Sequence, residues 1–390
     1  MPADLTAFDW SDPLLLEQQL SPGEHALRHN ARAFAEHHLA PRVAQRFRSA
    51  RADPALFREM GRQGLLGAWL PASEGGSGLG AVAEGLLARE IERVDSGYRS
   101  MLCVQPSLVM QAIWLCGSAA QRQQYLPGLA SGAMVGCFGL VDGERPLRAR
   151  SVAGGYLLDG VKRRITNGPL ADVLVVWASD ADGVARGFVL RKGMPGLTVP
   201  VLHGSAGLRA ALYGDIVMEQ VFCPREALLP DGGAVAVETC LTASRYGVAW
   251  GALGAAEACW HAARRHALER SQFGQPLAFS EMVQQKLADM QAGIAMALQG
   301  CLRLGRLREA GLATAEMTAM VKRHACATAL DAARGARDLI GGNGIDDSAG
   351  VLRHLSNLEM VQAYEGRRQA DALALGCPRT VAHMLRQKAG

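Results

Sequence analysis

One apolar stripe in the last third of the chain restricts the possible folds more than any other feature. Apolar side chains recur there every three or four residues, at Val283, Leu287, Met290, Ile294, Leu298 and Leu302. This spacing places all of them on one face of a long helix. Because such a face is stable only when it packs against other helices, the chain from about Val235 onward is predicted to form a four-helix arrangement.

The middle of the chain has a different pattern. Short runs rich in β-branched residues lie between turn-forming residues, at positions 156–158, 173–177, 187–190 and 215–218. Strands at this spacing are typical of a small antiparallel barrel or sandwich. Asp182-Gly183, between the second and third runs, is typical of a hairpin turn.

The first third of the chain has helical periodicity, over residues 24–47, 54–64, 81–94 and 106–115. The glycine-rich stretch Gly75–Gly80 follows no predicted strand, so a tight loop between helices is favoured over a phosphate-binding loop. The predicted fold class is α+β and mostly α. Its predicted domains are an N-terminal helical domain (1–134), a middle β domain (135–232) and a C-terminal helical bundle (233–390).

The composition excludes several functional classes. The chain has 41 basic and 37 acidic residues and no basic run, so no nucleic-acid partner is predicted. Its nine cysteines show no CxxC spacing, which indicates a reduced, cytoplasmic location and no metal site. The first ten residues have no apolar signal, and no apolar run reaches the roughly 20 residues that a membrane span requires.

Several local segments carry a family resemblance. They are Leu87–Ser100, Ser244–Gly251, Gly341–Ile345, Arg353–Glu359 and the tetrapeptide Ala363-Tyr364-Glu365-Gly366. Together they resemble the acyl-CoA dehydrogenases, most closely glutaryl-CoA dehydrogenase, and the likeness runs over nearly the whole chain. The resemblance implies the acyl-CoA dehydrogenase fold: an N-terminal helical domain, a small β-barrel domain and a C-terminal four-helix bundle.

Glu365 is the catalytic residue that the resemblance implies, because the matching glutamate removes the α-proton of the acyl thioester. A carboxylate in that role needs an apolar pocket that raises its pKa. Tyr364 beside it could pack on the ligand. The alternative for Glu365 is a glutamate at a helix end without a catalytic role.

The resemblance further implies that Arg99 binds the distal carboxylate of a dicarboxylic acyl group, which suits a planar guanidinium. The alternative is a surface ion pair with Asp95. Glu90 either orients Arg99 or a water molecule, or is a solvated helix carboxylate. Cys103 replaces a serine that assists the carboxylate site, and Arg245 also belongs to the implied substrate site.

FAD is the cofactor that the resemblance implies. Arg270 and Phe273 match a segment that reaches the flavin diphosphate across a subunit interface, and Gly341 and Gly342 match the segment near the adenosine half. A plain helix C-cap is the alternative for the glycines. Thr166 and Asn167 match residues near the flavin ring.

Departures from the family pattern concentrate on the flavin. Val141 stands where a threonine holds the ring, the Gly-Ser-Asp that follows is absent, and the loop is shorter. Arg164 stands in place of the tryptophan that covers the flavin, and Arg367 replaces a threonine. A stretch with small hydroxyl residues is replaced by 208–213. Since valine cannot donate a hydrogen bond, weakened flavin binding is one expectation, and phosphate binding by the new arginines is the other.

The predicted function is an acyl-CoA dehydrogenase-like oxidoreductase acting at the α,β-carbons of a short, dicarboxylic, glutaryl-like acyl thioester, with decarboxylation as an accompanying step. The thioester carrier is CoA or an acyl carrier protein, electron-transfer flavoprotein is the expected electron acceptor, and the expected assembly is a homotetramer. One alternative is a flavin-poor or flavin-free descendant that uses Glu365 for proton transfer, decarboxylation or cyclisation. The other is a non-catalytic partner subunit.

Overall fold

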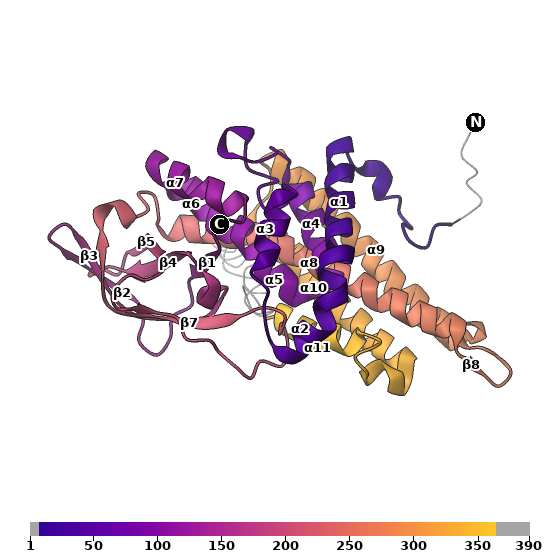
Figure 1. Cartoon of the computed structure of the whole chain (residues 1–390). Coiled ribbons are helices and arrows are strands. Elements are labelled where there is room, and N and C mark those ends of the chain that lie inside the picture. Colours follow the sequence, from indigo (N-terminus) through magenta and orange to yellow (C-terminus); the bar gives the residue numbers. More distant parts are fainter. Residues whose placement is uncertain (1–7, 364–390) are drawn as a thin grey trace, which may run out of the picture.

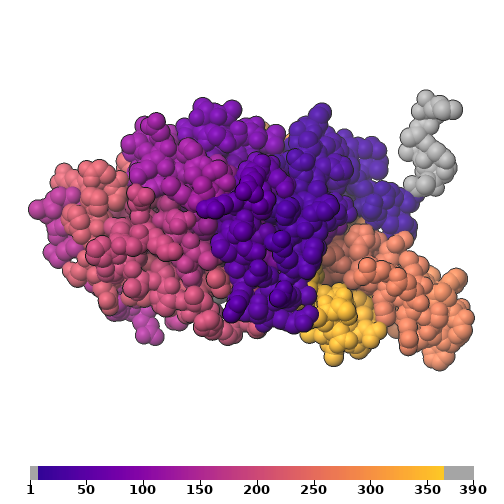
Figure 2. Space-filling model, in the orientation of Figure 1, coloured from indigo at the N-terminus to yellow at the C-terminus, as the bar shows by residue number. Residues whose placement is uncertain are grey.

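The computed structural model describes residues 8–363, and the element order is helices, then a β-sheet, then helices (Figure 1). This confirms the predicted α+β, mostly α class. The N-terminal helices are α1 (Pro22–Phe34), α2 (Val43–Ser49), α3 (Ala55–Arg62), α4 (Ala81–Glu92), α5 (Ser96–Val104), α6 (Gln111–Cys116) and α7 (Ala119–Ala130). A π-helical turn (Gln105–Met110) joins α5 to α6. In Figure 2 the first of these helices, in indigo, cover the centre of the face shown.

Local sequence signals explain where these helices begin and end. Ser21 and Glu24 form a capping box at the start of α1, and the Asp95 side chain accepts a hydrogen bond from the amide of Gly97 at the start of α5. The helix expected over 24–47 is interrupted at Ala40–Arg42, a single 3₁₀ turn that contains Pro41. The Gly75–Gly80 stretch is a tight loop: a Cβ at Gly76 would lie 2.0 Å from the carbonyl oxygen of Leu70.

The middle of the chain forms one curled seven-stranded sheet. Its strands are β1 (Gly136–Gly139), β2 (Arg148–Val152), β3 (Gly155–Thr166), β4 (Val173–Ser179), β5 (Ala185–Arg191), β6 (Leu197–Thr198) and β7 (Tyr213–Pro224). The strand order is β1-β4-β2-β3-β7-β6, with β5 on β4. All four predicted strands and the hairpin turn at Asp182-Gly183 are confirmed.

The sheet is mixed, so the expectation of a purely antiparallel sheet was wrong. β1 pairs with β4 in parallel, with Gly136 opposite Val173, and β2 meets β4 in parallel at one pair. β3 runs antiparallel to β2, and the chain reverses again at the Gly168–Leu170 turn, so β4 runs in the same direction as β2 and β1. The alternation of apolar residues along a strand indicates which face is buried, but it does not indicate whether neighbouring strands are parallel or antiparallel.

Between residues 233 and 363 the chain forms three long helices and a shorter one: α8 (Ala234–Glu269), α9 (Glu281–Glu309), α10 (Ala315–Ile340) and α11 (Val351–Val361). The apolar stripe lies in α9, where Met290, Ile294, Leu298 and Leu302 are buried. A small hairpin, β8 (Ser271–Gln272) and β9 (Gln275–Pro276), joins α8 to α9 at the end of the bundle far from the sheet (Figure 1).

Glycines allow the N-terminal helices to approach α8 closely. A Cβ at Gly85 of α4 would lie 2.3 Å from Nε1 of Trp250, and a Cβ at Gly254 of α8 would lie 2.1 Å from the carbonyl oxygen of Arg89. The two helices therefore pack almost backbone to backbone, which fixes α4 and α5 on the bundle. Among residues 8–363 no helix is long and apolar enough to cross a membrane.

Candidate functional site

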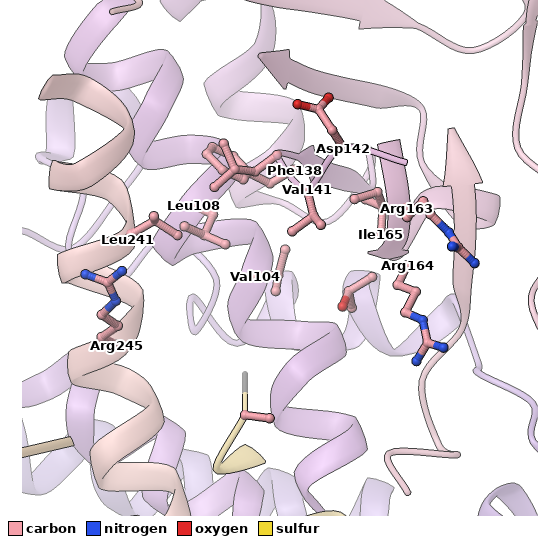
Figure 3. Close-up of a pocket in the computed structure, with 13 residues that line it drawn as sticks. Val104, Leu108, Phe138, Val141, Asp142, Arg163, Arg164, Ile165, Leu241 and Arg245 are labelled. Carbon is pink, nitrogen blue, oxygen red and sulfur yellow. The ribbon is translucent and has the colours of Figure 1, made fainter. Parts of the chain in front are cut away.

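A cavity lies between the sheet, the α5–α6 region and α8 (Figure 3). Its volume is about 690 Å³. One part of its wall is apolar, with side chains from α5, the π-helical turn, β1 and α8: Val104, Leu108, Phe138 and Leu241. Ala363, the last described residue, also lines the cavity. An apolar cleft with a few polar groups is the usual form of a small-ligand site.

Arginines supply the positive charge of this cavity from two sides. Arg245 projects from α8 on one side, and Arg163 and Arg164 come from β3 on the other (Figure 3). Arg245 pairs with Glu238 at 2.5 Å, and Arg163 lies 3.6 Å from a carboxylate oxygen of Asp215. Among the described residues no carboxylate forms an ion pair with the guanidinium of Arg164.

A β-bulge in β3 determines where Arg164 lies. The register of β3 against β7 shifts between Lys162 and Ile165, and Arg164 has a φ of 54°. Its backbone amide donates a hydrogen bond of 2.8 Å to Asp215 of β7. A left-handed backbone is unfavourable for a residue other than glycine, so this hydrogen bond stabilises a strained position at the cavity.

The segment after β1 is tied to β3 and forms the wall beside Arg164. The carbonyl of Val141 accepts from the amide of Arg163 at 2.8 Å, and the amide of Gly143 donates to the carbonyl of Val161 at 2.8 Å. Asp142 accepts from Lys162 Nζ at 2.6 Å and from the amide of Leu147 at 3.0 Å. This segment is therefore an ordered extension of the sheet.

Lys162 is buried below this segment. Burial lowers its pKa, while the hydrogen bond from Nζ to Asp142 acts in the opposite direction. Nζ also donates to the carbonyl of Leu140 at 2.9 Å. Lys162 therefore fixes the backbone that carries Leu140 and Val141 into the cavity wall.

Thr166 lines the cavity, and its hydroxyl lies 3.4 Å from that of Ser100. Asn167 has a structural place: it is fully buried, and its side-chain amide donates to the carbonyls of Met101 at 2.8 Å and Gly136 at 3.3 Å. Cys103 is buried next to the lining residue Val104, and desolvation raises the pKa of its thiol to about 12. The thiol therefore stays neutral at physiological pH.

With this geometry, the chain matches known proteins along nearly its whole length. Residues 21–133 match the family model of the acyl-CoA dehydrogenase N-terminal domain, and residues 231–375 match that of the C-terminal domain. The chain belongs to the acyl-CoA dehydrogenase family. The family resemblance predicted from the sequence is confirmed, and the chain is an acyl-CoA dehydrogenase-like oxidoreductase.

The relatives of this acyl-CoA dehydrogenase family member include enzymes with different substrates in their names. It is 31% identical over 364 residues to a short-chain specific acyl-CoA dehydrogenase of Megasphaera elsdenii, a match that covers 89% of this chain and 95% of the relative. The crystal structure of glutaryl-CoA dehydrogenase from Mycobacterium smegmatis superposes with a TM-score of 0.90 at 37% identity, covering 93% and 95% of the two chains. A complex of a glutaryl-CoA dehydrogenase from that organism with FADH2 also matches, with a TM-score of 0.90 at 36% identity, covering 92% of this chain and 95% of the other.

FAD is the cofactor of the acyl-CoA dehydrogenase family, and the cavity can be compared with what a flavin ring requires. A flat heteroaromatic ring needs apolar faces and hydrogen-bond donors along its edge. Phe138, Leu140 and Ile165 offer apolar surface, while the hydroxyl of Thr166 and the guanidinium of Arg164 are donors. The described residues fit such a ring, although Val141 contributes no side-chain donor.

The expected carboxylate-binding residue Arg99 is buried in α5 rather than at the surface. Its Nε donates to Glu92 at 2.6 Å, and the side chains of Arg99 and Glu92 are 2% and 0% exposed. The alternative of a surface ion pair with Asp95 was therefore wrong. Arg99 is not among the residues that line the cavity.

Glu90 is buried as well, so the alternative of a solvated carboxylate was wrong. Its described ion-pair partner is Arg93, at 3.4 Å. The carboxylate that meets Arg99 is Glu92, two residues further along α4. Residues two apart point to nearly opposite sides of a helix, which explains why Glu90 does not take that place.

The remaining predicted cofactor residues lie away from the cavity in this chain. Arg270 ends α8, and Phe273 is fully exposed at the tip of the β8–β9 hairpin with a φ of 53°. Gly341 and Gly342 follow α10, in agreement with the helix-end alternative, and Gly341 has a φ of 66°. Tyr364, Glu365 and Arg367, for which the sequence predicts roles, lie outside the described residues.

Some residues that shape the site gave no recognisable signal in the sequence. In the sequence, Asp215 is recognisable only as part of a predicted strand. Glu92 is recognisable only as part of a segment that resembles the family. Lys162 and Asp142 lie 20 positions apart, and only the sheet brings them together. Within residues 8–363 no group of histidine, cysteine and acidic side chains could hold a metal ion.

Proposed function

We propose that the chain oxidises the α,β-carbons of a short acyl thioester that carries a second carboxylate. The proposal rests mainly on the lining of the cavity. Its wall is apolar and suited to a short acyl chain, and arginines lie on two opposite sides. A guanidinium binds a carboxylate through two parallel hydrogen bonds and stays charged at all physiological pH values. The similarity to glutaryl-CoA dehydrogenase structures supports the same substrate class.

Glu365 is the proposed base for the α-proton. It follows Ala363, which lines the cavity, by two positions in the sequence. FAD, when bound, supplies the acceptor for the β-hydrogen and its electron pair. The same proposal includes loss of the second carboxylate as CO₂ and transfer of the electrons to electron-transfer flavoprotein. It also includes a thioester carried by CoA or an acyl carrier protein, and a homotetrameric assembly.

The test is turnover of two substrates by protein saturated with FAD. Glutaryl-CoA and butyryl-CoA differ by the second carboxylate, and dye-coupled oxidation together with mass analysis of the product follows both. We expect kcat/KM to be higher for glutaryl-CoA and Glu365→Gln to abolish oxidation of both. Glu359→Gln is the matched control, because Glu359 is an exposed residue of α11 that pairs with Arg334. Oxidation of neither thioester by the FAD-saturated protein would contradict the proposal.

A second candidate is proton transfer, decarboxylation or cyclisation of an acyl thioester without flavin. One observation favours it: Val141 lines the cavity without a side-chain donor, and the amide of Gly143 is used within the sheet. Its test is exchange of the α-hydrogen of butyryl-CoA with D₂O, followed by NMR in flavin-free protein. Exchange that requires Glu365 and persists without FAD supports this candidate, and exchange only with FAD contradicts it.

A further inference from the structure

Asp95 and Asn357 form a hydrogen bond inside the protein, although 262 positions separate them in the sequence. The side-chain amide of Asn357, in α11, donates to the carboxylate of Asp95, at the start of α5, over 2.8 Å, and both side chains are completely buried. The same carboxylate accepts from the amide of Gly97 at 2.7 Å and lies 3.1 Å from Nε of Arg353. Buried polar contacts therefore join the start of α5 to the middle of α11.

Asn357 also holds the loop between β6 and β7. Its side-chain oxygen accepts from the amide of Leu208 at 2.6 Å. Leu208 is buried with a φ of 53°, which is unfavourable for a residue other than glycine, so the loop keeps this shape only because its surroundings hold it. The contact is close, because a Cβ at Gly207 would lie 2.5 Å from the carbonyl oxygen of Ser356.

The three segments that meet at this buried pair all continue into the wall of the cavity. α5 ends at Val104, and Ala363 follows the end of α11; both residues line the cavity. The loop continues to Leu212, whose carbonyl accepts from the amide of Asn167 at 2.9 Å, next to the lining residue Thr166. The pair itself does not line the cavity, so it connects three parts of the wall from behind.

We propose that Asn357 and Asp95 are positioning residues for the α-proton transfer assigned to Glu365. This inference rests on the proposed function for the role of Glu365. Because Glu365 follows the end of α11 by four positions in the sequence, a shift of α11 against α5 changes where the base meets the α-carbon. Proton transfer requires heavy atoms at about 2.6–3.2 Å, and a misplacement of roughly 1 Å can lower a rate about 100-fold.

The polar character of the contact supports this role. Asn357 donates to one segment and accepts from another, so two partners fix its side chain. A buried polar network whose members are hydrogen-bonded specifies one arrangement of the elements that it joins. Arg353 adds a contact one turn earlier in α11, where its Nη2 donates to the carbonyl of Val94 at 3.3 Å. α11 is therefore held against the start of α5 at two successive turns.

The experiment separates turnover from binding and from stability. Asn357→Ala removes both side-chain hydrogen bonds, and it is compared with wild type after saturation with FAD. The substrates are glutaryl-CoA and butyryl-CoA, each with and without deuterium at the α-carbon. We expect kcat to fall about 10- to 100-fold and KM to change less than about threefold. The deuterium isotope effect should increase, because proton transfer becomes a slower step.

A control with a similar loss of stability separates positioning from folding. Leu56→Ala removes apolar contacts at a fully buried position of α3, which does not line the cavity. It should lower the melting temperature at least as much as Asn357→Ala, and should keep kcat within about twofold of wild type.

An exchange of the two residues tests the hydrogen bond itself, and it decides the question even if Asn357→Ala does not fold. Asn357→Asp keeps the size of the side chain but places a second carboxylate against Asp95. The double variant Asp95→Asn/Asn357→Asp puts a donor opposite an acceptor again. Its kcat should therefore be about tenfold higher than that of Asn357→Asp alone.

Three results would overturn the inference. The first is an unchanged kcat and isotope effect in folded Asn357→Ala. The second is an equal fall of kcat in Leu56→Ala, which would make the loss a consequence of stability. The third is the same kcat in Asn357→Asp and in the exchanged double variant. All three leave oxidation by wild type intact, whereas a wild type that oxidises neither thioester contradicts the proposed function instead.

Discussion

Arg99 and Glu92 form an ion pair inside the protein, with Nε and Oε2 separated by 2.6 Å. The two residues belong to consecutive helices, α5 and α4, and both side chains are almost completely buried. A Cβ at Gly251 of α8 would lie 2.2 Å from the same oxygen of Glu92. The pair therefore lies at the point where three helices meet and where α8 comes closest to it.

Breaking this pair should destabilise the protein strongly. Glu92→Gln removes a counter-charge from a buried guanidinium, which costs about 3–5 kcal/mol of the free energy of unfolding. Glu59→Gln is the control, because Glu59 pairs with Arg62 at 2.6 Å on the exposed side of α3 and should contribute less than about 1 kcal/mol. Urea denaturation measures both, and equal losses would contradict the structural role of Glu92.

Gly251→Ala should also destabilise the protein, by crowding the Arg99–Glu92 pair. The added methyl group would contact the carboxylate of Glu92 and lie 3.3 Å from Nε of Arg99, so we expect a loss of about 1–3 kcal/mol. Gly247, one turn earlier in α8, has open space at its Cβ. Gly247→Ala should therefore stabilise the helix by about 0.5–1 kcal/mol. The same urea measurements test whether the two changes have opposite signs.

Stability should decrease as the pH falls below about 6.5, and His354 should account for part of the decrease. Burial lowers the pKa of His354 to about 3. Between pH 6.5 and pH 3 the unfolded chain therefore binds more protons than the folded chain, so acid favours unfolding. Each fully buried neutral histidine contributes a slope of up to about 1.4 kcal/mol per pH unit.

The measurement compares wild type with His354→Gln from pH 7.5 to pH 5, a range above the normal titration of carboxylates. The variant should lose stability less steeply than wild type below pH 6.5. Above pH 7 both proteins should show the same slope, which serves as the internal control. Identical slopes over the whole range would mean that His354 is protonated in the folded state.

Val141→Thr should strengthen the binding of FAD about fivefold. The change adds one hydroxyl donor to the cavity wall, and one hydrogen bond contributes roughly 1 kcal/mol. Quenching of flavin fluorescence in flavin-depleted protein gives the dissociation constant. Val184→Thr is the control, since Val184 is exposed in the turn between β4 and β5. An unchanged constant would show that position 141 does not contact the flavin.

The sequence predicted the fold class because helices and strands depend on local patterns. The stripe in α9 and the four β-branched runs each lie in a continuous stretch, so periodicity was sufficient to find them. The direction of β1 against β4 depends on a crossing between distant strands, which no local pattern records.

The site was predictable only where a motif identified a residue. Arg245, Thr166, Val141 and Arg164 came from the family resemblance, and all four line the cavity. Glu92 and Asp215 could not be found in this way, because each acts through a partner that the packing of helices or a bulge brings near. A bulge also changes which residues of a strand share a face, so alternation could not predict where Arg164 would lie.

Arg164→Gly should preserve or raise the stability of the protein. Glycine adopts a φ of 54° freely, and the relief of roughly 1–2 kcal/mol exceeds or offsets the roughly 0.5–1 kcal/mol that glycine costs through the unfolded chain. Arg163→Gly is the matched control, because Arg163 is not among the residues with positive φ, so glycine brings its cost there and also removes the contact with Asp215. In thermal unfolding, the melting temperature of Arg164→Gly should thus be higher than that of Arg163→Gly. The reverse order would show that the Arg164 side chain stabilises the fold more than the bulge strains it, and that the residue is structural.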